Sequence, residues 1–181
     1  IERTLLRPRD VMQFLNECFI SALNSPRVSW EALTRAEGVY SEKRIKSLYE
    51  EWSQVYPCLK ETIEILRGIP FIFKRSTLAE RLYNIADKLI DNHDDPCGKA
   101  VIDYCNSGGK TNESEVVSEI LNCLYRIGAV GVKVSATEPY MWSDHGKAVL
   151  SKSEIKRVNQ IQVHKMLLRT LGINELEDDA S

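Results

Sequence analysis

Two arginines flank a proline near the start of the chain. Arg7 and Arg9 stand on either side of Pro8, and apolar side chains then recur at helical spacing. Pro8 suits the first position of a helix, where positive charge opposes the helix dipole. An arginine there can reach the phosphates of a nucleotide held by a neighbouring domain and stabilise developing charge. The alternative is that both arginines pair with nearby acids, at Glu2, Asp10 or Glu17.

The five cysteines lack the close pairing that is typical of a metal site. They are an odd number without a C-x-x-C pair, which favours a reducing, cytoplasmic compartment and buried free thiols. Zinc sites normally present two close pairs of ligands, whereas only one loose pair occurs here, so no metal site is predicted. An enzyme that uses Cys97 with His93 stays open as an alternative. The residues nearest to a ligand set are His93, Asp95, Cys97 and Cys105.

No catalytic motif is complete. The string G-G-K-T at residues 108–111 looks like the end of a phosphate-binding loop, but Tyr104 stands where that loop needs glycine, and a helix is predicted before it instead of a strand. The string S-D-H at residues 143–145 is interpreted as a turn, because three consecutive residues do not make a catalytic triad. We therefore predict no catalytic residue and no cofactor in this chain.

Composition limits the classes of function. The chain has 181 residues, a formal net charge of -2 and 43% hydrophobic residues, which suits one ordinary globular domain or two small ones. There is no overall positive field that would attract phosphates or anionic lipid. No apolar stretch approaches the roughly 20 residues of a membrane span. Because the chain opens with Ile1 and no leader pattern follows, we expect a cytoplasmic piece of a longer protein without membrane association.

Apolar spacing predicts helices throughout the first part of the chain. We expect helices over residues 8–23, from an N-cap at Ser29 to Gly38, over 41–54, and over 59–66 before Gly68. Gly38 is expected to end or kink its helix. Residues 3–68 are thus predicted to form a helical, lid-like domain.

In the second part of the chain the spacing of apolar residues changes from helical to alternating. Pro70 indicates a connector at residues 69–73, where we place the domain boundary. Helices are expected from a capping box of Thr77 and Glu80, over 98–105, from Asn112 to Gly128, from a cap at Ser151, and over 164–171. Valines alternate over 130–134 and an apolar segment returns at 140–142, which predicts a β-hairpin. The expected fold is mainly α, with a winged-helix-like domain over 69–173 and an acidic tail over 174–181.

The charge of the last helix before the hairpin decides between partners. In a winged helix this helix reads DNA and the hairpin is the wing. Here the helix from Glu113 to Arg126 carries a net charge of -2, which repels a duplex. We therefore favour a protein-facing surface. The alternative, a regulator that binds nucleic acid, would use a basic patch of Arg3, Arg7, Arg9, Lys74, Arg75 and Arg81.

Several short strings resemble one family. Residues 7–16 (R-P-R-D-V-M-Q-F-L-N) are similar to the start of the helical lid in P-loop ATPases of the KAP and STAND type, above all those of bacterial antiviral defence loci. The strings A-E-G-V-Y-S at 36–41 and E-E-W at 50–52 also resemble the lid. Residues 124–133 resemble the family's hairpin entry, and V-H-K-M at 163–166 resembles a late string in which Lys165 replaces the usual proline.

The resemblance implies a regulatory fragment of a larger enzyme. It implies a lid and a winged-helix-like part in which Arg9, with Arg7 second, senses nucleotide. ATP and magnesium would belong to the parent protein, because the phosphate-binding loop and the acidic strand that binds magnesium are absent from this sequence. Hydrolysis by the fragment alone is therefore not implied. The implied partners are the ATPase core of the same polypeptide and a protein partner or a second copy.

Overall fold

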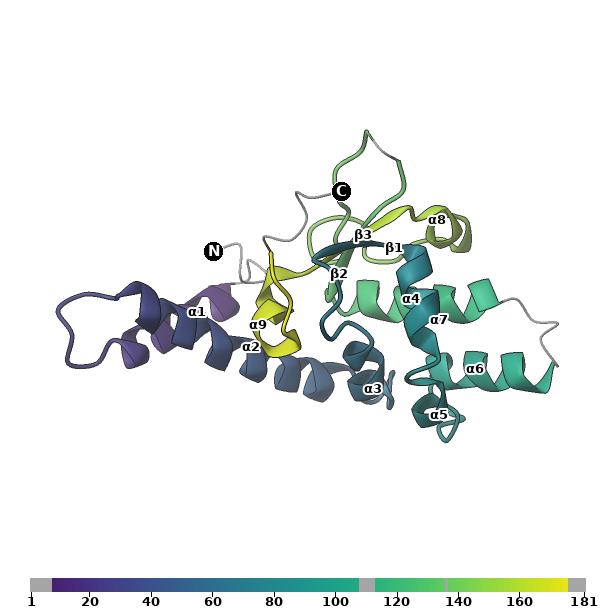
Figure 1. Cartoon of the computed structure of the whole chain (residues 1–181), viewed down its shortest axis with the longest axis horizontal. Coiled ribbons are helices and arrows are strands. Elements are labelled where there is room, and N and C mark those ends of the chain that lie inside the picture. Colours follow the sequence, from purple (N-terminus) through teal and green to yellow (C-terminus); the bar gives the residue numbers. More distant parts are fainter. Residues whose placement is uncertain (1–7, 108–112, 136, 176–181) are drawn as a thin grey trace.

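The chain folds into a mainly helical molecule with one small antiparallel sheet, as the composition of its segments predicts. A computed structural model describes residues 8–107, 113–135 and 137–175. Two long helices form an arm on the left of Figure 1, α9 (Leu168–Leu171) lies against the second of them, and the sheet and most of the remaining helices lie to the right. The expected fold class, mainly α with a small β module, is confirmed.

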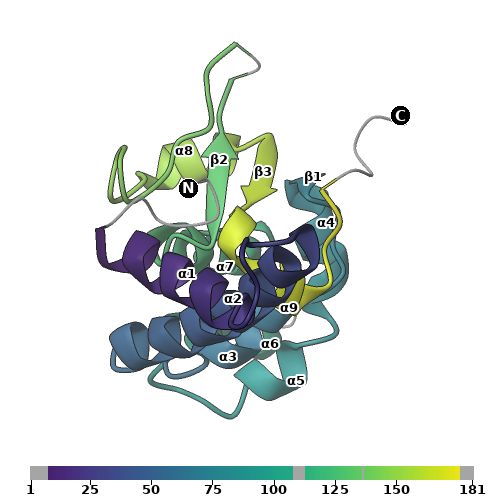
Figure 2. The ribbon, with the colours of Figure 1, turned by 90° about the vertical axis from the view of Figure 1, so that its left-hand side faces the viewer.

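The arm is a hairpin of α1 (Pro8–Ser21) and α2 (Trp30–Trp52), which lie side by side in Figures 1 and 2. The ring of Phe14 meets that of Tyr40 edge-on, with 5.4 Å between the ring centroids. Ser29 caps α2 as predicted, because its hydroxyl oxygen accepts a hydrogen bond from the Ala32 amide at 3.2 Å. The hairpin is therefore held by apolar packing and begins its second helix at a local signal.

The expected break at Gly38 does not occur. The helix α2 continues through Gly38 to Trp52, so the two helices predicted on either side of it are one. A glycine inside a helix costs about 1 kcal/mol relative to alanine. The burial of Tyr40, Ile45 and Leu48 in the same helix outweighs that cost, since one buried side chain of this size contributes about 1.5–3 kcal/mol.

A three-stranded sheet follows the short helix α3 (Leu59–Glu64). Its strands are β1 (Ile72–Lys74), β2 (Val130–Lys133) and β3 (Gln160–Val163), in the order β1-β3-β2 with both pairs antiparallel. Residues 69–73 were expected to be a connector, and their end instead forms the edge strand β1. An edge position agrees with Pro70 just before it, because proline lacks the amide that a central strand would need.

The predicted hairpin is only partly correct. The main partner of β2 is β3, and the segment 140–142 meets β2 through a single bridge, in which Val132 and Met141 exchange backbone hydrogen bonds of 3.0 and 2.8 Å. The ring of Trp142 lies so close to Gly131 that a Cβ atom there would be 2.5 Å from it. Ile161 and Val163 of β3 are fully buried, so β3 adds two core side chains to the sheet, whereas Tyr140, Met141 and Trp142 are only partly buried.

Helix α7 (Glu113–Arg126) is the central element of this part. It packs against α4 (Arg75–Leu82), α6 (Pro96–Asn106), α8 (Lys152–Arg157) and β2. The capping box expected at Thr77 and Glu80 is wrong, because β1 leads directly into α4 and Lys74 occupies the N-cap position. A break at Tyr83 then separates α4 from α5 (Ala86–Leu89). The capping box of Ser151 and Glu154 is confirmed.

The last segments pack back onto the arm. The 3₁₀ helix η1 (Lys165–Leu167) and α9 (Leu168–Leu171) both contact α2. The Gly68 amide donates to the Leu171 carbonyl at 2.8 Å, and Arg169 pairs with Glu37 at 3.1 Å. One cluster of buried side chains includes residues from both sides of the expected boundary after Gly68. Among the described residues no helix is long and apolar enough to cross a membrane.

Candidate functional site

Arg9 lies in the first turn of α1 with its side chain 72% exposed. Its Nη2 atom donates to Glu51 Oε1, near the end of α2, at 3.3 Å. Two of the acids expected from spacing have other partners: Glu17 pairs with Lys43 at 2.6 Å, and Asp10 lies against Arg44, whereas Glu2 lies outside the described residues. Arg7, the second predicted site residue, lies outside the described residues.

Glu51 also binds a buried arginine. Arg44 Nη1 donates to Glu51 Oε1 at 3.1 Å and Arg44 Nη2 to Oε2 at 3.4 Å, the two-pronged geometry that suits a guanidinium and a carboxylate. The Arg44 side chain is 1% exposed, and Asp10 Oδ1 lies 3.8 Å from its Nη1 atom. A buried charge is strongly unfavourable unless it is paired, and Arg44 has two carboxylates to pair with. We call Arg9, Glu51, Arg44 and Asp10 the arginine cluster.

A cleft of about 250 Å³ adjoins this cluster. It opens between the end of α2, the end of α7 and the loop that follows β2, and Arg44 and Glu51 line it. On the α7 side, Arg126 lies over the rings of Trp52 and Tyr56, 5.8 and 5.9 Å from their centroids, and donates to the Tyr56 hydroxyl at 3.1 Å. The remaining lining residues are Ile127, Gly128, Ser143, Asp144, Ala148 and Val149.

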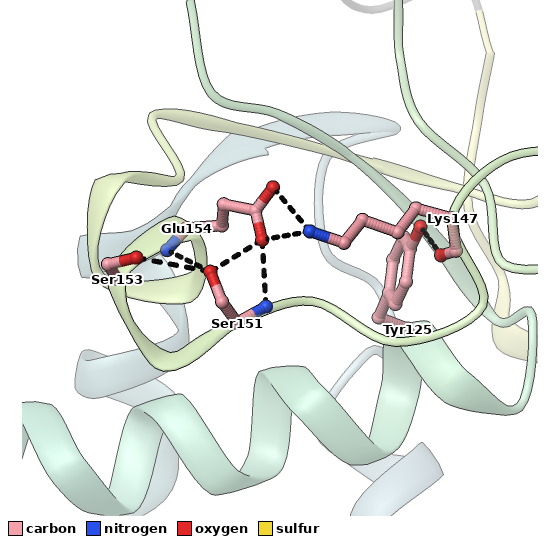
Figure 3. Close-up of polar contacts among 5 residues, drawn as sticks. All are labelled: Tyr125, Lys147, Ser151, Ser153 and Glu154. Atoms are coloured by element: carbon pink, nitrogen blue, oxygen red, sulfur yellow. Dashed lines mark hydrogen bonds and ion pairs between the residues drawn. The ribbon is translucent and has the colours of Figure 1, made fainter.

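The loop that forms the far wall of the cleft is fixed by a polar network (Figure 3). The Tyr125 hydroxyl donates to the Lys147 carbonyl, and Lys147 Nζ donates to both oxygens of Glu154 at 2.9 and 2.6 Å. The Glu154 carboxylate also accepts from the Ser151 amide at 2.8 Å. The Lys147 and Ser151 hydrogen bonds lower the pKa of Glu154 to about 2. The wall is thus tied to α7 on one side and to α8 on the other.

His164 and Asp144 lie deep in the same region. The His164 ring is buried, meets Trp142 edge-on at 5.1 Å, and accepts a hydrogen bond from the Met166 amide at Nδ1. Burial lowers the pKa of His164 to about 4, although the charge of Asp144 opposes this shift. Asp144 Oδ1 is 2.8 Å from His145 Nδ1. His164 therefore caps η1 as a neutral ring, which is a structural role.

Of the residues considered for metal or thiol chemistry, Asp95 has a structural role. Asp95 is fully buried and caps α6 by accepting from the Cys97 and Gly98 amides. Burial raises the pKa of the Cys58 thiol to about 11 and that of Cys123 well above its usual value, which makes both poor nucleophiles. The described residues contain no group of three or more potential ligands that could hold a metal ion. Four cysteines are buried free thiols as expected, whereas Cys105 is exposed.

The expected basic patch is not brought together. Arg75 is half-buried and donates to the Ile155 carbonyl and to Ser114 and Ser118, so it joins α4 to α7 and α8. Arg81 donates to two backbone carbonyls near the end of α3. Helices α1 and α4 lie on different sides of the molecule in Figures 1 and 2, which separates Arg9 from this group. Arg3 and Arg7 lie outside the described residues.

Helix α7, which stands where a winged helix has its recognition helix, is covered. Apart from Glu115, every residue of α7 is at least partly buried, because α4, α6 and α8 pack around it. Its side chains are therefore not free to enter a groove, and the comparison with a winged helix does not extend to a recognition helix. The net negative charge noted from the sequence points in the same direction.

Comparisons with known proteins show that the chain is similar in sequence to part of a longer polypeptide. A family described as the FunZ-associated C-terminal helical domain matches residues 1–49, which include α1 and most of α2. A transposon gamma-delta 80.3 kDa protein of Escherichia coli K12 is 26% identical over 152 residues, which are 81% of this chain and 20% of that relative. The chain therefore spans about a fifth of the relative's length. No solved structure matches it.

The comparisons show that residues 1–49 are similar to a C-terminal helical domain and that the chain is distantly similar to a transposon protein, and neither description refers to a P-loop ATPase or an antiviral locus. Of the arginine cluster, the sequence points to Arg9 as a site residue and to Asp10 only as a possible partner of Arg7 and Arg9. Glu51 stood unremarked within the E-E-W string, and Arg44 resembles the exposed basic residues around it in α2. The burial of Arg44 has no local signal, because it depends on the packing of α1 against α2, which brings Asp10 to it.

Proposed function

We propose that this chain is a regulatory, protein-binding module of a larger P-loop ATPase, that it is not catalytic by itself, and that Arg9 senses the phosphates of bound nucleotide. The observation that carries the proposal is the state of Arg9, whose exposed guanidinium is held by one partly exposed carboxylate. Such a surface ion pair contributes about 0–1 kcal/mol, so a phosphate group can replace Glu51 at little cost. ATP and magnesium would be bound by the ATPase core and not by these residues.

The arginine cluster links Arg9 to the cleft between the arm and the loop after β2. Glu51 holds Arg9 and Arg44 at the same time, and Arg44 lines the cleft between the arm and the loop after β2. When Arg9 turns to a phosphate, Glu51 retains only Arg44, and the balance of charge at the cleft changes. Nucleotide state is thereby coupled to the junction of the two parts of the chain.

The test is ATP hydrolysis by the natural polypeptide that contains these residues together with the proposed core. We expect Arg9→Ala to lower kcat at least tenfold, and Arg9→Lys to restore part of it, because lysine keeps the charge and loses the two-pronged contact. Arg157→Ala is the matched control, since Arg157 is an exposed arginine of α8 and lies outside the arginine cluster. Unchanged hydrolysis in Arg9→Ala would show that Arg9 is not a nucleotide sensor. The absence of hydrolysis in the parent protein would show that it is not an ATPase.

A further inference from the structure

The outward surface of α1 is apolar and nearly free of charge. Met12 and Phe19 are each 66% exposed, and Leu23, just beyond the helix, is 72% exposed. The two acids of this helix, Asp10 and Glu17, are buried. The exposed positions from the start of the helix to Leu23 are Pro8, Arg9, Met12, Leu15, Asn16, Phe19, Ile20, Leu23. Arg9 is the one charged residue among them.

These positions share one side of the helix. Residues 9, 12, 16, 19 and 23 follow one another at steps of three and four, which places them in a row along the axis. Phe14 and Cys18 lie on the opposite side, where they pack in the core. A surface helix normally presents polar residues away from its core. Helix α1 instead has a second apolar side, which we call the α1 face, and Arg9 stands at its end.

We propose that the α1 face is the docking surface for another domain of the same longer polypeptide, and that this domain offers an apolar surface to it. An apolar, charge-depleted surface rich in Met, Phe and Leu has the composition of an interface core. The family match covers the residues that carry the face, and four-fifths of the transposon-encoded relative lies outside the part that this chain matches. Much polypeptide is therefore available in such proteins to cover it.

The size of the face favours a partner in the same chain over a second copy. A helix of 14 residues is about 21 Å long, and with a width of about 10 Å it offers roughly 200 Å². A stable complex between separate proteins buries about 800 Å² on each partner. A domain linked through the chain meets the face at a high effective concentration, so a smaller contact is sufficient.

Protection of the face from a thiol reagent tests this inference. With Cys105, the exposed natural thiol, changed to Ser, Phe19→Cys supplies a reactive thiol on the α1 face. Tyr83→Cys supplies a control at the end of α4, where Tyr83 is 67% exposed. In the 181-residue chain, which encloses a core of its own, we expect both variants to react with a maleimide at similar rates. In the longer natural polypeptide the Phe19→Cys variant should react at least tenfold more slowly, at every protein concentration.

Other occupants would show themselves in the same measurement. Equal rates in the short and long proteins would overturn the proposal. Protection of the short chain that increases with its own concentration would identify a second copy instead, and protection only with vesicles of phosphatidylethanolamine and phosphatidylglycerol would identify a lipid surface. Met12→Cys repeats the test if Phe19→Cys disturbs folding. The inference shares with the proposed function only the existence of a larger polypeptide. Docking on the α1 face needs no nucleotide, so the docking proposal does not depend on whether Arg9 is a sensor.

Discussion

At the scale of single residues, Asp95 joins two segments that are distant in the sequence. Its Oδ1 atom accepts from the Cys97 and Gly98 amides at 2.7 and 3.2 Å, and Oδ2 accepts from the Cys58 amide at 2.8 Å. In Asp95→Ala the helix loses its cap and the Cys58 amide is left buried without a partner. We expect a loss of about 3 kcal/mol in the free energy of unfolding. The measurement is urea denaturation followed by circular dichroism.

Its sequence neighbour provides the control. Asp94 is exposed, so Asp94→Ala should leave the urea midpoint almost unchanged. If the two alanine variants had the same stability, the cap and the link to Cys58 would contribute nothing, and the structural role given to Asp95 would be wrong. Asp95 would then again be a candidate metal ligand.

His164 makes stability depend on pH. Its pKa is lowered from the ordinary 6.5 to about 4, so between these values the unfolded chain binds a proton that the folded chain does not. Stability is therefore fully present above pH 6.5 and falls as the pH decreases toward 4. We expect the loss from this residue to be about 3 kcal/mol. His164→Asn keeps an acceptor for the Met166 amide but cannot titrate, so its stability should fall less steeply over this range in urea titrations at several pH values.

At the scale of elements, Gly38 allows a direct test of the continuous helix α2. A Cβ atom added there would meet nothing within 4 Å. Gly38→Ala should therefore stabilise the protein by about 0.5–1 kcal/mol, because alanine loses less backbone entropy in a helix. Gly98→Ala is the opposite case, since its Cβ would lie 2.3 Å from the Asn92 carbonyl oxygen, and it should destabilise. A shift of the same sign in both, measured by thermal unfolding, would contradict the structure.

The sequence predicts best those helix ends that are determined by residues close to one another in the chain. The cap at Ser29 and the capping box at Ser151 act over three residues, and both are present. The end expected at Gly38 failed because packing over the whole of α2 outweighs the cost of one glycine. The pairing of β1 with β3 joins residues 72–74 to 160–162, and no local pattern specifies that. The site follows the same rule: Arg9 is marked by its place in α1, whereas Glu51 is 42 positions away.

At the scale of the whole molecule, the question is whether the arm and the sheet-bearing part unfold together. The expected division into residues 3–68 and 69–173 stays a prediction, and the contacts of α9 bear on it. Leu171 is fully buried, its carbonyl accepts from the Gly68 amide, and the helix that carries it packs on α2. A residue in this position stabilises both parts at once, because the two share one continuous core.

Leu171→Ala should lower the free energy of unfolding by about 2–5 kcal/mol and keep a single transition. Far-UV circular dichroism reports mainly on the helices, and Trp142 fluorescence, in a chain with Trp30→Phe and Trp52→Phe, reports on the region beside the sheet. The two signals should change at the same urea concentration before and after the substitution. Separate midpoints in the unsubstituted chain would show two independent units, and a separation only in Leu171→Ala would show that this contact is what couples them.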